Sequence, residues 1–473
     1  MKKHSLLLFA IIPLVLSGCG NNNSPEDPGD SAPGGTPSEP AEEGYLKKDV
    51  TVKVDPMIRS TNPNEPYNLS FGYDDELFLT SAKTYNKDLS MLSFGAAMAS
   101  GTDRRGANFY TDLKFSDVTF HDYDKEPTKD TMGYIMAHRA IDDYELISVS
   151  FRGLGYGLEW ANNFIIGKTG NHEGFNARGQ EAYEDLQDYI ETYAKDKALK
   201  IWISGYSRAG ALSDVLASFI MKGNEINVTQ ENLFVYTFEA PASLSEENAI
   251  AYENVHNITN EADIVAAIPP ASYGLYRCGV DYPIYDANVT TLAKQFDQDA
   301  IIPEFTEITD LTDEKMDTDR KVLEFVLSTV FDKKEEPSTP DIYANTREQY
   351  VDNYQAGLSS GIGYIFALKS DTRSKLLNDL KGLGLGAISI IYDSTGKSLM
   401  DFFKPYLDQD HVQYNEEQLL ADCAILIKGV SNLFLQLLLM YAGLYADSIT
   451  RLVTMHYTDT VYILLKNAHS KAN

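Results

Sequence analysis

Short apolar runs and amphipathic runs alternate along the middle of the chain. Apolar or β-branched runs predict strands over 133–139, 145–151, 200–204, 233–238 and 255–259. Apolar residues at helical spacing predict helices over 85–100, over 177–195 and directly after Ser207. Strands that alternate with helices form a mainly parallel sheet covered on both faces. The pattern therefore predicts an α/β fold.

From about residue 280 to residue 450 the strand pattern gives way to helical runs. Helical spacing recurs over 321–330, 347–368, 373–383 and 416–453. The most apolar stretch, 424–446, carries Lys428, Asn432 and Gln436 four residues apart, which places them on one helical face. A membrane span rarely carries such a polar stripe. We expect a buried amphipathic helix there, and a helical cap inserted into the α/β domain over about 280–450.

The N-terminus has the features of an export signal. Lys2 and Lys3 precede an apolar core, 6–16, that is too short to span a membrane. The sequence Leu16-Ser17-Gly18-Cys19 then resembles a bacterial lipobox, in which the cysteine is acylated and becomes the first mature residue. A plain signal peptide with an unrelated cysteine is the alternative.

The stretch after Cys19 is almost free of apolar residues and is rich in Asn, Ser, Pro, Gly and Glu. Such a composition cannot bury enough surface to fold. We therefore expect a signal peptide over 1–18, a disordered tether over 19–45 and the α/β domain over 46–473. The domain is predicted to be exported and held at the outer side of a bacterial cell membrane through acylated Cys19.

The net charge limits the classes of binding partner, and the cysteines raise the question of a disulfide. The net charge of −29 argues against nucleic acid as a partner and against direct binding to an anionic membrane surface. The sequence contains no zinc-ligand or calcium-loop spacing, so we expect no metal and no cofactor. Cys278 and Cys423 could form a disulfide in an exported protein, but two distant cysteines leave the pairing open.

A strand, a tight turn and a helix follow each other around Ser207. The turn Gly205-Tyr206-Ser207-Arg208-Ala209-Gly210 is close to the nucleophile-elbow pattern G-x-S-x-G, with alanine in place of the last glycine. On such a turn the serine hydroxyl projects above the sheet, and the N–H groups at the start of the helix can stabilise an oxyanion. A serine in an ordinary βα turn is the alternative.

A nucleophilic serine needs a histidine base and a carboxylate that orients the histidine. In this architecture the order along the chain is Ser, acid, His. Asp263 follows a predicted strand and is the candidate acid, with Glu239 as its rival. His456 lies between two apolar segments, and we prefer it to His411 and His469, which lie in a polar loop and in the C-terminal tail. The alternatives are a capping role for Asp263 and a core role for His456.

Six segments in order resemble motifs of the class 3 lipase family, the fungal-lipase-like α/β-hydrolases, and more closely its bacterial members. They are Ser150-Phe151-Arg152-Gly153, His172-Glu173-Gly174-Phe175, the Ser207 turn, Tyr236-Thr237-Phe238-Glu239-Ala240-Pro241, 260–270 and 456–462. The resemblance implies an α/β-hydrolase fold that cleaves carboxylic esters, as a lipase or esterase, through an acyl-serine intermediate. It implies Ser207 as nucleophile, Asp263 as acid and His456 as base, with an ester or lipid as substrate. It assigns the oxyanion donors to the backbone N–H groups of Leu154 and Arg208.

Several positions depart from the family pattern. Many members carry Ser or Thr at the position of Leu154, and Tyr206, Arg208 and Glu239 replace histidine, leucine and glycine. A hydrolase-fold lipoprotein that binds a ligand without catalysis, and an amidase or peptidase that uses the same triad, therefore remain as alternatives. The position of 280–450 between acid and base suggests a lid that shapes the acyl pocket.

Overall fold

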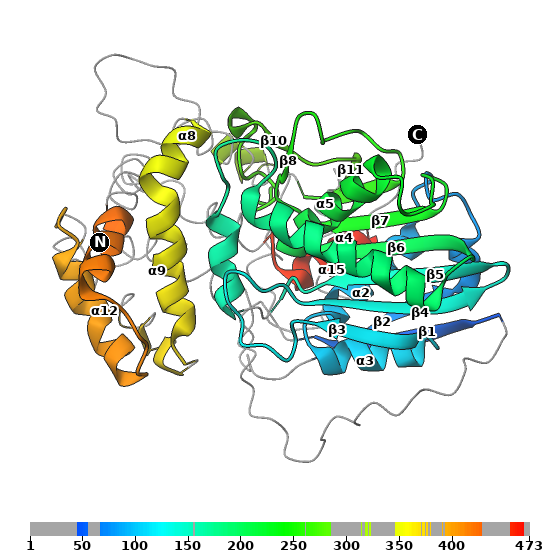
Figure 1. The fold of residues 1–473 in the computed structure, drawn as a ribbon, viewed down its shortest axis with the longest axis horizontal. Coiled ribbons are helices and arrows are strands. Elements are labelled where there is room, and N and C mark those ends of the chain that lie inside the picture. The colour runs from blue at the N-terminus through cyan, green and yellow to red at the C-terminus, as the bar shows by residue number, and fades with distance from the viewer. Residues whose placement is uncertain are drawn as a thin grey trace.

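The computed structural model describes residues 45–54, 67–154, 157–260, 262–284, 346–369, 393–427 and 455–467, with scattered residues between 314 and 390. Within this part a seven-stranded sheet lies at the centre (Figure 1), in the order β11-β9-β7-β6-β5-β4-β3. Its strands are β3 (Ser116–His121), β4 (Tyr134–Ile141), β5 (Tyr144–Phe151), β6 (Ala198–Tyr206), β7 (Leu233–Phe238), β9 (Val255–Thr259) and β11 (Val280–Pro283). The strands from β5 to β11 run parallel, whereas β3 and β4 are antiparallel.

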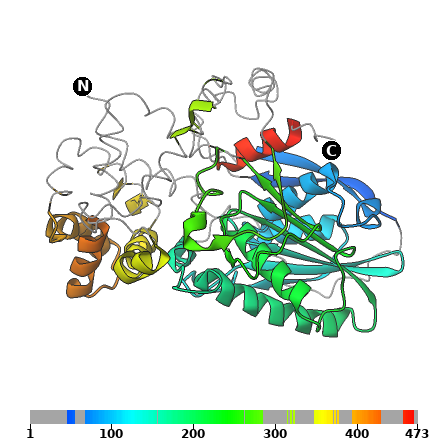
Figure 2. The ribbon, with the colours of Figure 1, turned by 90° about the horizontal axis from the view of Figure 1, so that it is seen from above.

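Both faces of the sheet are covered, as the alternation of apolar residues along β6 requires. Trp202 packs into one core, and its neighbours Ile201 and Ile203 pack into the other. Figure 2 shows the two layers on opposite sides of the sheet. One layer contains α4 (Glu173–Tyr193) and α5 (Arg208–Lys222). The other contains α2 (Lys87–Ala99), α3 (Asp103–Asp112), α15 (Thr458–Asn467) and the hairpin of β1 (Lys47–Val54) and β2 (Tyr67–Asp74).

The observed elements agree with the predicted α/β pattern. The strands over 133–139 and 145–151 are β4 and β5, joined at Asp142-Asp143, where Asp142 has a φ of 52°. The helix predicted over 177–195 begins earlier, at Glu173, because the His172 side chain accepts a hydrogen bond from Phe175 N and caps the first turn. The order, direction and coverage of the strands confirm the α/β-hydrolase type of fold.

The sheet extends further along the chain than the pattern predicts. Strand β11 pairs with β9 up to Pro283, so the sheet continues past residue 280, where only helices were expected. The four residues of β11 are too few to show the apolar alternation by which a strand is recognised. Short connecting elements complete the domain: η1 (Asp75–Phe78), η2 (Gly157–Phe164), η3 (Ala271–Tyr273) and the pair β8 (Leu244–Ser245) and β10 (Leu275–Tyr276).

The described residues beyond 346 are mainly helical. They include α8 (Arg347–Tyr350), the π-helical turn η4 (Val351–Gln355), α9 (Ala356–Ala367) and α12 (Lys397–Gln409), and residues 416–427 are also helical. Residues of α9, α12 and 416–427 form an apolar cluster that also contains Trp160 of η2, whose ring stacks on Phe366 at 5.7 Å. Figure 1 shows α9 beside η2. Most of the predicted runs 321–330, 373–383 and 416–453 lies outside the described residues, as does the polar stripe of Lys428, Asn432 and Gln436.

Arg347 joins the helical region to the α/β domain. Its guanidinium donates hydrogen bonds to five backbone carbonyls of the loop before α4, those of Ile166, Gly167, Thr169, Gly170 and Asn171, at 2.5–3.2 Å. The start of α8 is therefore attached directly to the loop that leads into His172.

Three expectations concern cysteines and the membrane. Cys278 and Cys423 are both buried and are not paired with each other. Among the described residues, none of the helices combines the length and apolar character needed to cross a lipid bilayer. The predicted signal peptide, Cys19 and all of the tether but its last residue lie outside the described residues.

Candidate active site

Ser207 lies at the sharp turn between β6 and α5. Its φ of 59° and ψ of −129° belong to a backbone region that non-glycine residues rarely adopt. The turn closes tightly, because a Cβ at Gly205 would lie 2.2 Å from Ala209 O. Ala209 itself is fully buried, so the alanine in place of the usual glycine fits the turn. This geometry is that of a nucleophile elbow.

Three side chains from distant parts of the chain meet at this turn. His456 Nε2 lies 2.8 Å from Ser207 Oγ, and His456 Nδ1 lies 2.6 Å from Asp263 Oδ2. All three side chains are buried. With the proton on Nδ1 donated to Asp263, Nε2 can accept the Ser207 hydroxyl proton, which is the arrangement that activates a serine.

Asp263 is held by the loop that follows β9. Its N–H donates to Asn260 O at 2.9 Å, and its Oδ1 accepts from Val265 N at 2.8 Å. The Asn260 side chain accepts from Ala262 N at 3.0 Å and so supports the same turn. These bonds leave Oδ2 directed at the imidazole.

His456 lies just before α15 and contacts β6 through Tyr206. The Tyr206 hydroxyl donates a hydrogen bond to the backbone carbonyl of His456. The two rings also stack, with centroids 5.2 Å apart and planes inclined by 24°. Tyr206 therefore holds both the backbone and the ring of the histidine beside the elbow.

The predicted oxyanion residues lie on either side of the same turn. Arg208 is the first residue of α5, so its N–H lies at the helix start. Gly153, directly before Leu154, packs on the elbow so closely that a Cβ there would lie 2.2 Å from Tyr206 O. Only glycine allows this approach, which brings the Leu154 segment beside the Ser207 turn.

A buried ionic network connects these two segments. The Glu159 carboxylate accepts from Arg152 through one oxygen and from Arg208 Nη1, at 2.7 Å, through the other. Arg208 Nε also donates to Asn163 Oδ1 at 3.0 Å. Sequence reasoning missed Glu159 and Asn163. The only hint in the sequence was that Arg152 and Arg208 have apolar neighbours. A charged side chain buried there requires a partner.

The remaining candidates lie in other environments. Glu239, the rival acid, is fully buried beside Asp263 and makes no hydrogen bond to a histidine among the described residues. His411 is exposed in the turn after α12. His469 lies outside the described residues, as does Cys19.

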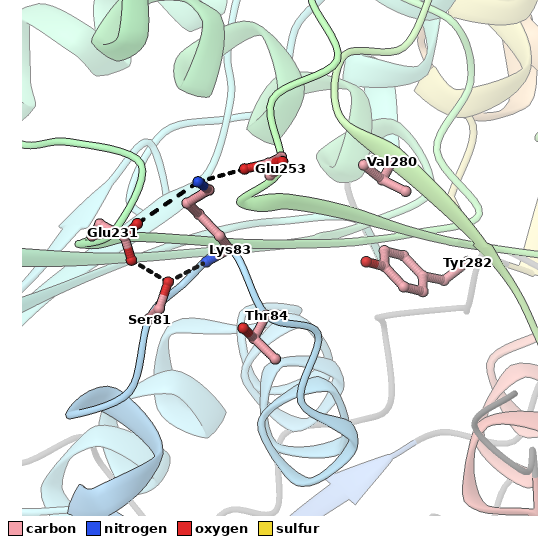
Figure 3. Close-up of a pocket in the computed structure, with 7 residues that line it drawn as sticks. All are labelled: Ser81, Lys83, Thr84, Glu231, Glu253, Val280 and Tyr282. Carbon is pink, nitrogen blue, oxygen red and sulfur yellow. Dashed lines mark hydrogen bonds and ion pairs between the residues drawn. The ribbon is translucent and has the colours of Figure 1, made fainter. Parts of the chain in front are cut away.

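The described residues contain no cluster of three or more histidine, cysteine or acidic side chains able to hold a metal ion. They do contain a polar pocket of about 440 Å³ at the other end of the sheet (Figure 3), where β7 and β9 begin. There Lys83 pairs with Glu253 at 2.5 Å and faces Glu231 at 3.8 Å. Ser207 and Asp263 follow the opposite ends of their strands, so this pocket is separate from the Ser207 turn.

Residues 148–273 match the family model described as lipase (class 3). This segment includes the predicted oxyanion loop, the Ser207 turn and the loop of Asp263 in one stretch. Over this segment the chain is similar to class 3 lipases.

Part of the chain is also similar to individual proteins. The lipase of Rhizomucor miehei is 25% identical over 167 residues, which cover 32% of this chain and 45% of that relative. The chain thus spans a little under half the length of this curated relative. Solved structures with similarity include a lipase from Rhizopus microsporus var. chinensis, with 21% identity, a TM-score of 0.33 and coverage of 42% and 75% of the two chains. Lipase II from Rhizopus niveus has 17% identity, a TM-score of 0.33 and coverage of 42% and 80%.

Proposed function

We propose that this protein is a serine hydrolase that cleaves carboxylic esters, as a lipase or esterase, with Ser207, Asp263 and His456 as its catalytic triad. The observation that carries the proposal is the continuous hydrogen-bonded chain from Ser207 through His456 to Asp263. The class 3 lipase-like segment and the name of the Rhizomucor miehei relative favour an ester over an amide as the substrate.

The reaction follows from the positions of the three side chains. Ser207 Oγ attacks the acyl carbon while His456 Nε2 takes the hydroxyl proton, and Asp263 stabilises the imidazolium that forms. The imidazolium then protonates the alcohol, which leaves, and the acyl group remains on Ser207. A water molecule, deprotonated by the same histidine, releases the acid and restores the serine.

The oxyanion of each tetrahedral intermediate lies at the start of α5 in this scheme. The backbone N–H groups of Arg208 and Leu154 are the proposed donors. Leu154 offers no side-chain hydroxyl, so backbone donors carry this task alone. Each such donor contributes about 10²–10³ in rate in comparable enzymes.

The proposal includes export and a lipid anchor. It rests on the basic and apolar segments of 1–18, on the lipobox-like sequence before Cys19 and on the polar stretch 20–44. In bacteria grown with an alkyne fatty acid, the wild-type chain should become labelled, and Cys19→Ala should not. Equal labelling of both would refute the anchor without affecting the hydrolase proposal.

The first experiment on the activity compares wild type and Ser207→Ala on p-nitrophenyl esters from acetyl to palmitoyl. The full chain in detergent should hydrolyse at least one ester, and the variant should lose this activity. The preferred chain length then distinguishes an esterase from a lipase. Full activity in Ser207→Ala would refute the proposal.

Matched amide substrates and a fluorophosphonate probe complete the test. Cleavage of amides but not of esters, abolished by Ser207→Ala, would replace the proposed substrate by an amide. A folded wild-type protein that reacts with neither substrates nor probe would instead support a binding protein.

A further inference from the structure

A second buried carboxyl group lies against the acid of the triad. Glu239 follows β7, its side chain is 0% exposed, and its carboxyl group lies beside that of Asp263. Its Oε2 accepts from Asn260 N at 3.0 Å. Its Oε1 is buried and has no hydrogen-bond donor against it among the described residues.

The backbone at Glu239 is in a conformation that favours glycine. Its φ is 50°, and a residue with a Cβ is disfavoured in this region. The Glu239 N–H donates a hydrogen bond to Ile258 O at 2.9 Å, and the strained backbone conformation is retained alongside it. Strain of this kind concentrates at functional positions.

Two ionised carboxylates in contact would repel each other, and both would be acceptors only. One of the two must therefore hold a proton. Asp263 accepts from His456 and from Val265 N, and these two donors stabilise a negative charge on it. Glu239 accepts from a single N–H group, so the proton belongs to Glu239.

The charges that surround Glu239 agree with this assignment. Burial, followed by the negative charge of Asp263, raises the pKa of Glu239 well above its ordinary value. Arg277 opposes this shift from a distance, but its guanidinium donates to Ala240 O, Ala266 O and Asp281 instead. No hydrogen bond from Arg277 to Glu239 is present in the described structure.

We propose that Glu239 is a protonated fourth member of the relay, whose carboxyl O–H donates to Asp263 and holds that carboxylate in place for His456. Glu239 is a positioning residue, since it acts through Asp263 and does not reach the serine. The inference rests on the proposed triad. It explains why a glutamate is present at a position where the backbone favours glycine.

Two variants separate the roles of the proton and of the side-chain volume. Glu239→Gln keeps a donor for Asp263 and an acceptor for Asn260 N, so kcat should stay within about threefold of wild type. Glu239→Leu keeps a side chain of similar size but removes both the donor and the acceptor. Because a hydrogen bond to a charged group is lost, its kcat should fall about 10- to 100-fold, with KM changed less than threefold.

The pH dependence of kcat is a further test, because a purely structural role of Glu239 would not change it. In wild type, kcat should decline at alkaline pH as Glu239 loses its proton and the two carboxylates repel. Glu239→Gln cannot lose this proton, so its alkaline decline should move to higher pH. Equal impairment of both variants, or identical alkaline limbs in wild type and Glu239→Gln, would overturn the proposal.

Two measurements test the proton without any activity. At neutral pH the infrared spectrum should contain a protonated-carboxyl band that Glu239→Gln removes. Asp214→Asn is the matched control, because burial raises the pKa of Asp214 well above its ordinary value and this variant should remove a different band. The downfield proton resonance of His456 Nδ1–H should persist in Glu239→Gln and be lost in Glu239→Leu.

These results also distinguish a failure of the proposed hydrolase function from a failure of the proposed role of Glu239. If wild type hydrolyses neither esters nor amides, the proposed function fails, and the infrared band and the His456 resonance still decide the state of Glu239. If wild type is active but Glu239→Gln removes no carboxyl band, the fourth member is refuted and the triad stands.

Discussion

The Tyr206 hydroxyl donates a hydrogen bond to the backbone carbonyl of His456, although 250 residues separate the two in sequence. Tyr206 also belongs to the elbow, one residue before Ser207. Ser207 and His456, the proposed nucleophile and base, are therefore both linked to the same residue. This contact gives the C-terminal segment a fixed position relative to β6.

Tyr206→Phe should lower kcat for ester hydrolysis by about two- to tenfold and leave KM nearly unchanged. The hydrogen bond is lost while the ring stack remains, and one such bond contributes about 0.5–1.5 kcal/mol. Steady-state kinetics on the preferred p-nitrophenyl ester measures the effect. Tyr206→Leu loses the stack as well and should be slower still, and a phenylalanine variant as fast as wild type would contradict this role.

Asp263→Asn should reduce kcat by about 10⁴, because an amide at this position favours the wrong imidazole tautomer and cannot stabilise the imidazolium. The fold should be retained, since the amide oxygen can still accept from Val265 N. Single-turnover acylation of Ser207 by a fluorophosphonate should slow in parallel. His411→Gln serves as control and should match wild type; a loss there would point to the wrong histidine.

Arg208→Leu should destabilise the protein by about 3 kcal/mol in urea unfolding. The change leaves the fully buried Glu159 with Arg152 as its remaining ion-pair partner among the described residues, and breaking a buried ionic group costs roughly 3–5 kcal/mol. The double variant Arg208→Leu, Glu159→Gln should recover part of this loss, because the unpaired charge is gone. Strictly additive effects of the two changes would show that the pair is not coupled.

His172 should make the protein sensitive to acid. Its Nε2–H donates to Asn163 O at 3.1 Å and its Nδ1 accepts from Phe175 N, so the neutral ring is required. Burial lowers the pKa of His172 to about 3. An unfolded histidine titrates near 6.5, so below that pH the unfolded state binds a proton that the native state does not. The contribution is fully present above about pH 6.5 and is lost as pH falls towards 3.

The matching variant is His172→Asn, which keeps an acceptor for the cap and removes the titrating group. Between about pH 6 and 4 its unfolding free energy should fall less steeply than that of wild type, by about 1.4 kcal/mol per pH unit. Urea unfolding across this range measures both slopes. His411→Asn, in an exposed turn, should keep the wild-type slope, and equal slopes for His172→Asn would disprove the linkage.

The sequence by itself determined the order of strands and helices and the position of the turn that carries the proposed nucleophile. The turn at Ser207 lies directly between an apolar strand and a helix. Because the three are adjacent in the chain, local periodicity and turn chemistry are sufficient to recognise them. Asp263 could only be separated from Glu239 by its loop context, and His456 from two other histidines by its apolar flanks. Strand β11 was missed because four residues carry too little pattern.

Only the tertiary structure decided which side chains meet. The contacts of His456 with Ser207 and Asp263 span 249 and 193 residues, and the Glu159 network joins η2 to the start of α5, 49 residues away. The contact between Glu239 and Asp263 likewise depends on two neighbouring strands ending at the same edge of the sheet. Such contacts are set by how the elements pack, and no local pattern of apolar and polar residues encodes that packing.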